Sequence, residues 1–213
     1  MNLLPVFISL SALFHLWADH HQKNILSMIF KPLTMVLIIL IVFERGIPLQ
    51  DYATFILWGL IFSLIGDMML LKPWYKFEWG LGSFLIGHVF YVIAFTRVGG
   101  VKWDILPLLP FIAFCLWLYR NIDPNLGRVK FPVIAYMTVI LVMMWQGMGI
   151  RLEDNPQFGM YVAVGAFIFY VSDSLLAYQK FKQPIKYGNI LVLSTYYVAQ
   201  YLLAKSSLII GVN

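Results

Sequence analysis

Long apolar segments follow one another along almost the whole sequence, and no other feature limits the fold of this chain as strongly. A helix needs about 20 residues to cross the hydrocarbon core of a bilayer. The pattern therefore predicts an all-α, polytopic membrane helix bundle with about eight transmembrane helices, in a single domain over residues 1–213. Charged residues, Pro or Gly separate eight such segments, near residues 4–18, 32–43, 52–71, 79–97, 105–119, 131–149, 158–178 and 188–204.

Composition excludes most other classes of protein. Hydrophobic residues make up 61% of the chain and charged residues only 12%, whereas a soluble domain carries about 25% charged residues. A soluble enzyme and a disordered chain are therefore excluded. The single cysteine, Cys115, forms no internal disulfide. Residues 33–40 lack the alternation of a transmembrane barrel strand. The net charge of +5 is small for a nucleic-acid partner, so we expect none.

The basic residues are distributed unequally between the two sides of the predicted membrane. Under the positive-inside rule the richer side faces the cytoplasm, so both termini are expected to be non-cytoplasmic. No Lys or Arg precedes Lys23, which predicts a retained first helix rather than a signal peptide. The richer side contains Lys23, Lys31, Lys72, Lys76, Arg120, Arg128, Lys130, Lys180, Lys182 and Lys186; the other contains Arg45, Arg97, Lys102, Arg151 and Lys205.

The two halves of the sequence align with each other at a constant offset. The offset of 106 residues follows from the pair that carries the alignment, Asp67 and Asp173. We therefore expect a 4+4 parallel internal repeat, with halves near residues 1–104 and 105–213. Such repeats are related by an axis along the membrane normal.

Three ionisable residues fall inside the predicted spans. They are Asp67, Asp173 and His88. An Asp at the centre of a span costs about 2.5–3.5 kcal/mol on insertion scales, so such a residue suggests a function. All three fall in the same half of the bilayer, the acids about 6–8 Å deep and the histidine about 13–14 Å deep, which predicts one shared cavity. Capping by the acids and simple packing of the histidine are the alternatives.

Weaker polar signals surround these residues. Lys31 and Pro32 are predicted to open the second helix, where Pro suits the first turn and Lys contacts a lipid phosphate or acts as an interfacial anchor. The last span carries Tyr197 and Gln200, for which interhelical hydrogen bonding is also expected. No Gly-x-Ser-x-Gly or His-Glu-x-x-His motif is present, so neither serine hydrolase nor zinc protease chemistry has support.

Four short motifs together resemble one known family. Gly66-Asp67-x-x-Leu70, Gly87-His88-x-x-Tyr91, Ser172-Asp173-x-x-Leu176-Ala177 and Tyr196-Tyr197-x-x-Gln200, with Lys31-Pro32 before them, resemble the YhhN/TMEM86 family over about residues 5–204. The resemblance implies eight spans and a bacterial inner-membrane location. It also implies lysoplasmalogenase activity, which hydrolyses the vinyl ether of a lysophospholipid taken from the bilayer and releases a fatty aldehyde. No cofactor and no metal are implied.

Vinyl ether hydrolysis needs an acid that protonates carbon and an anion that stabilises the oxocarbenium ion. We assign these roles to Asp67 and Asp173, in either order, with His88 positioning water or tuning one of the acids. Substrate contacts are expected from Lys31, Tyr91, Ser172, Tyr197 and Gln200. A proton-coupled transporter of a small molecule or lipid is the alternative, because such carriers use the same residue types. A non-catalytic lipid-binding or scaffold protein, which would tolerate loss of both acids, is a third possibility.

Overall fold

The computed structural model describes residues 3–44, 46, 51–72, 75–150 and 155–210. Within these ranges every regular element is helical, with eight α-helices and three short 3-10 helices. The α-helices are α1 Leu4–His20, α2 Asn24–Val42, α3 Asp51–Met69, α4 Phe77–Gly99, α5 Leu109–Ile122, α6 Lys130–Met148, α7 Pro156–Phe181 and α8 Gly188–Ile209. The 3-10 helices are η1 Leu106–Leu108, η2 Asp123–Asn125 and η3 Gly127–Val129.

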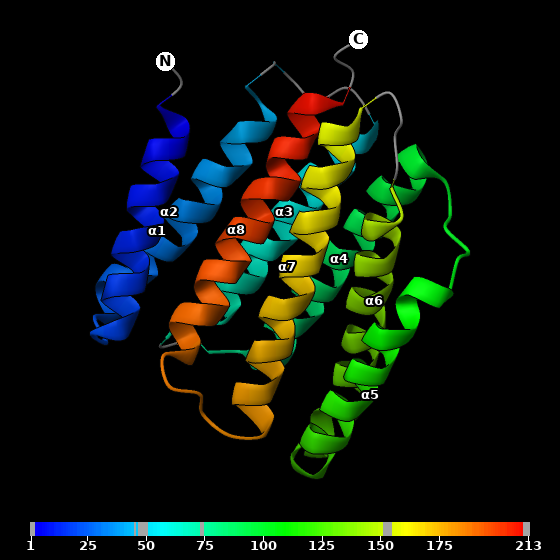
Figure 1. Cartoon of the computed structure of the whole chain (residues 1–213). Coiled ribbons are helices and arrows are strands. Elements are labelled where there is room, and N and C mark those ends of the chain that lie inside the picture. The colour runs from blue at the N-terminus through cyan, green and yellow to red at the C-terminus, as the bar shows by residue number, and fades with distance from the viewer. Residues whose placement is uncertain (1–2, 45, 47–50, 73–74, 151–154, 211–213) are drawn as a thin grey trace.

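The helices run alternately up and down, and both ends of the chain lie at the same end of the bundle (Figure 1). The connections α1–α2, α3–α4, α5–α6 and α7–α8 lie at the opposite end, which we call the basic end. Among the basic residues assigned to the other side, Arg45 and Arg151 lie outside the described residues.

All eight predicted apolar segments are helical, but not all have the dimensions of a span. Five helices are both long and apolar enough to cross a membrane: α2, α3, α4, α7, and α6 together with η3 (Gly127–Met148). α1 and α5, with 17 and 14 residues, are shorter. Large apolar side chains cover the outside of the bundle, among them Leu13, Ile25 and Phe131. Such a surface suits contact with lipid tails.

The prediction that Lys31 and Pro32 open the second helix is wrong. α2 begins at Asn24, so Pro32 lies in its interior. Proline removes one backbone donor, but a membrane helix tolerates this loss because its neighbours satisfy the freed group. The apolar residues before Pro32 therefore continue the helix toward the basic end. As a result Lys31 is not a loop residue: it lies within the bundle, with 12% of its side chain exposed.

Small residues bring α3 and α4 close together. A Cβ atom on Gly66 would lie 2.7 Å from the Phe84 ring, and one on Gly59 would overlap the Tyr91 ring. Close approach of this kind is how membrane helices gain packing energy. α3 with α4 and α7 with α8 are the most extensively packed pairs. α1 and α2 also pack extensively, whereas α5 lies loosely against α6. The two halves are therefore not packed alike throughout.

Candidate active site

Two acids from distant parts of the chain line a single cavity near the basic end. Asp67 lies two residues before the end of α3, and Asp173 lies in α7, eight residues before its end. Only 3% and 9% of their side chains are exposed. The cavity has a volume of about 210 Å³, and we call it the acid chamber. Asp173 lies deeper from its helix end than expected because α7 continues to Phe181.

Asp67 is held by a cation and a hydroxyl group. The Nζ atom of Lys31 on α2 lies 3.1 Å from its Oδ1 atom. The hydroxyl of Tyr196 on α8 donates a hydrogen bond of 2.7 Å to its Oδ2 atom. An opposite charge and a donor at hydrogen-bond distance both favour the ionised carboxylate. Both contacts therefore act against the cost of burying a charge on Asp67.

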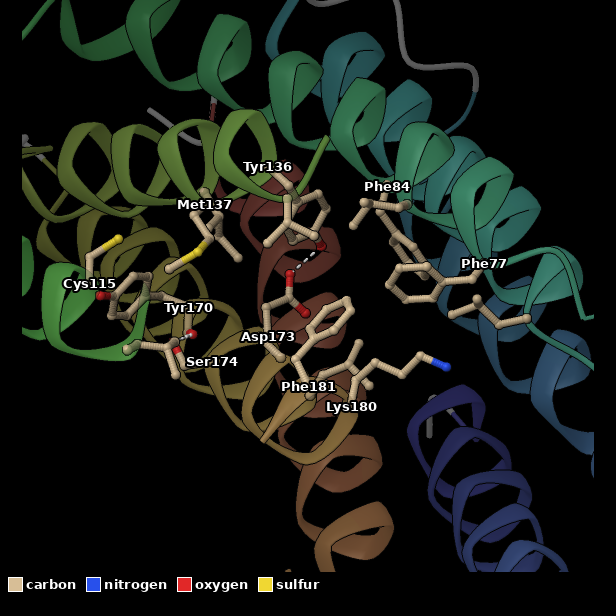
Figure 2. A pocket seen from close by; sticks show the side chains of 17 residues that line it. Phe77, Phe84, Cys115, Tyr136, Met137, Tyr170, Asp173, Ser174, Lys180 and Phe181 are labelled. Atoms are coloured by element: carbon tan, nitrogen blue, oxygen red, sulfur yellow. Dashed lines mark hydrogen bonds between the residues drawn. The ribbon is translucent and has the colours of Figure 1, made fainter. Parts of the chain in front are cut away.

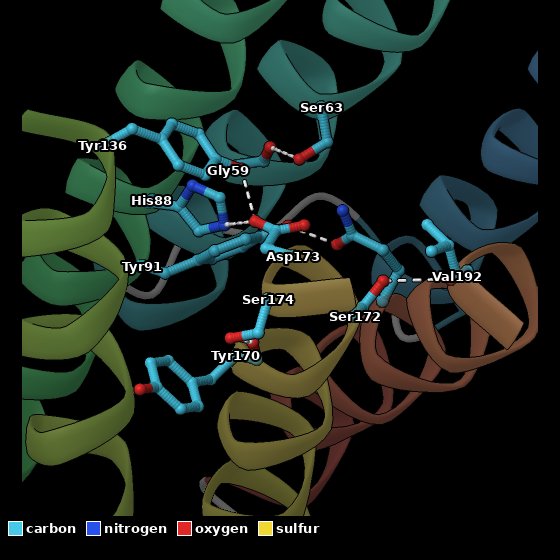
Figure 3. Close-up of polar contacts among 11 residues, drawn as sticks. Gly59, Ser63, His88, Tyr91, Tyr136, Tyr170, Ser172, Asp173, Ser174 and Val192 are labelled. Atoms are coloured by element: carbon cyan, nitrogen blue, oxygen red, sulfur yellow. Dashed lines mark hydrogen bonds and ion pairs between the residues drawn. The ribbon is translucent and has the colours of Figure 1, made fainter. Parts of the chain in front are cut away.

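Asp173 has neutral neighbours instead. The hydroxyl of Tyr136 on α6 donates a hydrogen bond to its Oδ2 atom. The Nε2 atom of His88 on α4 lies 3.7 Å from the same oxygen, beyond hydrogen-bond length. Figure 3 shows the His88 ring and the Tyr136 hydroxyl meeting at this carboxyl group. The His88 ring is 1% exposed and packs edge-on against Phe169 at 4.7 Å. Among the described residues, no Lys or Arg is paired with Asp173.

Each acid is contacted by one helix of its own half of the chain and by one helix of the other half. Asp67 on α3 is contacted from the preceding helix, α2, and from α8 in the other half. Asp173 on α7 is contacted from its own preceding helix, α6, and from α4 in the other half. The helices correspond in order, but the contacting residues do not match at the offset of 106, where Lys31 corresponds to Met137 and His88 to Ser194. This difference makes one acid site cationic and the other neutral.

Two further cavities adjoin the acid chamber. On the side of α1 and α2 lies a polar cavity of about 520 Å³, which we call the vestibule. Asp19, Lys31 and Asn189 line both the vestibule and the chamber. On the opposite side lies a narrow apolar cavity of about 50 Å³.

The apolar cavity shares Asp173 with the chamber. Figure 2 shows the Tyr136 hydroxyl hydrogen-bonded to the Asp173 carboxyl group, with Phe77 and Phe84 of α4 on the other side of the cavity. Its remaining wall comes largely from Cys115, Leu118, Val133, Met137, Ile140 and Ala177 of α5, α6 and α7.

The other predicted site residues lie at or behind the chamber wall. Ser172 lines the chamber, and its hydroxyl donates to the carbonyl oxygen of Val192 at 2.9 Å. Tyr91 donates to Oε1 of Gln200 at 2.6 Å, which joins α4 to α8 behind the wall.

Tyr197 also lies behind the wall of the acid chamber. Its hydroxyl hydrogen-bonds with the Nδ1 atom of His15 at 2.7 Å, while its neighbour Tyr196 reaches the chamber. Of the predicted residues, Asp67, Asp173, Lys31 and Ser172 therefore meet in the chamber, and His88 contacts Asp173 from behind.

Sequence reasoning did not place Tyr136 or Asp19 at the site, and it used Tyr196 only as part of a motif. The chain has 12 tyrosines and 17 phenylalanines, so no local signal separates a tyrosine that donates to a buried acid from one that only packs. Asp19 belongs to the first loop region by sequence, and only the fold places it beside the chamber. Among the described residues, no three His, Cys, Asp or Glu side chains are grouped to hold a metal ion.

Comparison with known proteins identifies the family. The YhhN family model matches residues 26–207. The lysoplasmalogenase TMEM86A of Bos taurus is 31% identical, over 97% of this chain and 88% of its own. The human TMEM86A lysoplasmalogenase is 32% identical over the same shares. The uncharacterized membrane protein YhhN of Escherichia coli O157:H7 is 24% identical, over 94% of this chain and 96% of its own. No solved structure matches. The chain therefore belongs to the YhhN family of membrane proteins.

Proposed function

We propose that this protein is a membrane-embedded lysoplasmalogenase-like hydrolase, which cleaves the vinyl ether bond of a lysoplasmalogen by carboxyl general acid catalysis. The observation that carries the proposal is the acid chamber, where two carboxyl groups of unequal environment adjoin a polar cavity on one side and an apolar cavity on the other. The named activity of the TMEM86A relatives supports the same reaction.

The surroundings of the acids assign their roles. Asp173 is the general acid, because its neighbours are neutral and a carboxyl group buried without a cation favours its protonated form. Asp67 is the stabilising anion, because Lys31 and Tyr196 both favour its charged form. Two carboxyl groups held apart in this way can supply acid and anion at one pH.

The reaction then follows from these roles. Asp173 gives its proton to the β-carbon of the vinyl ether, which leaves an oxocarbenium ion stabilised by Asp67. Water adds to the cationic carbon and loses a proton to the Asp173 carboxylate, forming a hemiacetal. The hemiacetal collapses when its hydroxyl proton moves to the ether oxygen and the carbon–oxygen bond to glycerol breaks. One water is consumed, and the products are a fatty aldehyde and a glycerophospho-alcohol. His88 positions the Asp173 carboxyl group during both proton transfers.

The shape of the site suits an amphiphilic substrate. The alkenyl chain points into the apolar cavity, and the glycerol and headgroup point into the vestibule. At about 50 Å³ the apolar cavity is too narrow to enclose a fatty chain, so the chain continues outward past α5. α5 is the loosely packed helix on this side of the bundle, which makes it the lateral entrance from the bilayer.

The same proposal includes the membrane arrangement. All eight helices span the bilayer of the bacterial inner membrane, with the basic end in the cytoplasm and both termini on the other side. α1 and α5 are shorter than a full span, and the residues next to each helix complete its passage across the bilayer. The headgroup would then enter from the cytoplasmic leaflet.

The direct test uses purified protein and two lipids. Lysoplasmalogen and an acyl lysophospholipid of the same chain length and headgroup are incubated separately, and free aldehyde and free fatty acid are measured. We expect aldehyde from the first lipid and no fatty acid from the second. Release of fatty acid from the acyl lipid, without aldehyde from lysoplasmalogen, would show that the protein hydrolyses esters instead.

The carrier alternative makes a different structural prediction. A carrier of this kind needs discontinuous helices at its binding site. α3 and α7, which carry the two acids, run without interruption over Asp51–Met69 and Pro156–Phe181. No observation on the described residues favours the carrier over the hydrolase.

A further inference from the structure

Tyr91 on α4 and Gln200 on α8 form a buried polar pair that the proposed hydrolysis does not use. Neither side chain is exposed, and neither lines the chamber, the vestibule or the apolar cavity. The Tyr91 hydroxyl donates a hydrogen bond of 2.6 Å to the Oε1 atom of Gln200. Burying polar groups in an apolar bundle is costly unless their hydrogen bonds are made. We therefore asked what the rest of the Gln200 amide group does.

The bond from Tyr91 fixes which way the Gln200 amide faces. An amide has an oxygen that accepts and a nitrogen that donates. Because Tyr91 donates to the oxygen, the nitrogen is turned away from Tyr91. Among the described residues, this Nε2 atom makes no hydrogen bond although it is fully buried. A buried donor without a partner is unfavourable, so the group beside it is the natural acceptor.

The group beside the amide is the hydroxyl of Tyr196. Tyr196 and Gln200 lie four residues apart on α8, and residues at this spacing share one face of a helix. The Gln200 amide interacts with the Tyr196 hydroxyl. The terminal torsion of a glutamine is broad, so a small rotation of the amide completes a hydrogen bond without moving either helix. The Tyr196 hydroxyl itself donates to the Oδ2 atom of Asp67 at 2.7 Å.

The direction of these bonds matters because a hydroxyl group has a single proton. With the amide nitrogen facing Tyr196, that proton is left for Asp67. With the amide reversed, its oxygen would compete with the Asp67 carboxylate for the same proton. Tyr91 prevents the reversal because it holds the amide oxygen on the other side.

The matching positions in the first half of the chain cannot form such a series. At the offset of 106, Tyr196 corresponds to Phe90 and Gln200 to Ala94, and neither of these side chains carries a donor. The series therefore serves Asp67 and has no counterpart at the other acid. This agrees with unequal roles for the two acids.

We propose that Gln200 is a positioning residue for Asp67 that acts through Tyr196. Its amide nitrogen donates to the Tyr196 oxygen and so commits the Tyr196 proton to the Asp67 carboxylate. Tyr91 holds the amide in the orientation that this requires. Donors arranged in one direction strengthen one another, so the series holds the carboxylate in place to stabilise the oxocarbenium ion. The inference rests on the proposed function for the role of Asp67, but the series itself can be tested without catalysis.

The kinetic test uses Gln200→Met, which keeps the length of the side chain and removes the amide. We expect kcat for aldehyde release to fall about tenfold with KM nearly unchanged, because the lost interaction acts in the transition state. Tyr91→Phe, which frees the amide to reverse, should change kcat in the same direction and serves if Gln200→Met does not fold. Tyr52→Phe is the matched control, and its kcat should be unchanged. Tyr52 is also buried and also bonds to α8, through Ser206 at 2.7 Å, but it lies at the other end of α3 from Asp67.

The decisive test is a double-variant cycle on the Tm in detergent, which needs no substrate. Gln200→Met and Tyr91→Phe are each made with and without Asp67→Asn. A hydrogen bond to a charged acceptor is about twice as strong as one to a neutral acceptor. The Tm loss from each variant should therefore shrink to about half or less when Asp67→Asn is present. The Tm loss from Tyr52→Phe should be the same in both backgrounds, because distant sites are additive.

The two proposals fail separately. Tm losses for Gln200→Met and Tyr91→Phe that are equal in both backgrounds would show that the pair only packs α4 against α8, and would overturn the inference even if aldehyde is released. An unchanged kcat in both variants would overturn it as well. A protein that releases no aldehyde but shows the expected coupling would reject the hydrolase and leave the donor series standing.

Discussion

At the residue scale, the two buried acids differ in what surrounds them. Asp67 faces the ammonium group of Lys31, whereas Asp173 faces the Tyr136 hydroxyl and the His88 ring. The sequence alone predicts the two acids, because an Asp inside an apolar span is costly. Their partners come from other helices and carry no local signal, so the difference between the acids becomes evident only when the helices are assembled.

The first prediction concerns the acids themselves. Asp173→Asn keeps the shape of the side chain but cannot supply the proton, so kcat for aldehyde release should fall by about 100- to 10,000-fold. Asp67→Asn removes the stabilising anion and should lower kcat by about 100- to 1000-fold. Asp51→Asn, an exposed acid at the other end of α3, is the control. Full activity in either chamber variant would remove that residue from the mechanism.

The second prediction concerns the Lys31–Asp67 pair. Lys31→Met leaves a buried carboxylate without its cation, which should destabilise the protein by about 3–5 kcal/mol. The loss is measured as a lower Tm in detergent. Adding Asp67→Asn to Lys31→Met removes the uncompensated charge and should restore most of the lost stability. A double variant as unstable as Lys31→Met alone would show that the pair is not energetically coupled.

At the element scale, the apolar pattern predicts the helices well and their ends less well. Every predicted segment is helical, yet α2 begins at Asn24 instead of Pro32. Proline marks a helix start in soluble proteins more reliably than in membranes, where the surrounding helices accommodate it. The same sequence signal therefore has two structural outcomes. Only the assembled bundle shows that Lys31 reaches Asp67 because its helix continues past the proline.

The third prediction concerns packing between α3 and α4. Gly59→Ala places a Cβ atom against the Tyr91 ring, so it should lower the Tm and disturb the Tyr91–Gln200 hydrogen bond. Gly82→Ala is the control on α4, where an added Cβ meets nothing within 4 Å. Because Ala favours helix over Gly by about 1 kcal/mol, the control should be neutral or stabilising. Equal Tm values for the two variants would contradict the close approach.

The fourth prediction concerns α5 as the wall of the chain-binding path. Cys115 on α5 is the only cysteine in the chain and lines the apolar cavity. A small membrane-permeable maleimide should alkylate it and inhibit aldehyde release, and a saturated alkyl lysolipid should protect it. Cys115→Ala should be active and insensitive to the reagent. If alkylation of Cys115 left the turnover of a long-chain substrate unchanged, the alkenyl chain of the substrate would have to bind elsewhere.

At the scale of the whole molecule, three cavities meet near the basic end: polar, acidic and apolar. Composition predicts a membrane bundle, and the spacing of the acids predicts a shared depth. Neither predicts the order of the cavities, because their walls combine residues from both halves of the chain. Asp19 illustrates this limit, since it appears as a loop acid by sequence and lies beside the chamber in the fold.

The most direct test of the central claim is hydrolysis of a lysoplasmalogen by the purified protein in D₂O. Protonation of the β-carbon by Asp173 places one solvent-derived hydrogen on the carbon next to the aldehyde carbonyl. Mass spectrometry of the rapidly trapped aldehyde should therefore find a single deuterium at that carbon, and Asp173→Asn should nearly abolish the product. Aldehyde without deuterium at that carbon, or no aldehyde at all, would contradict carboxyl general acid catalysis at this site.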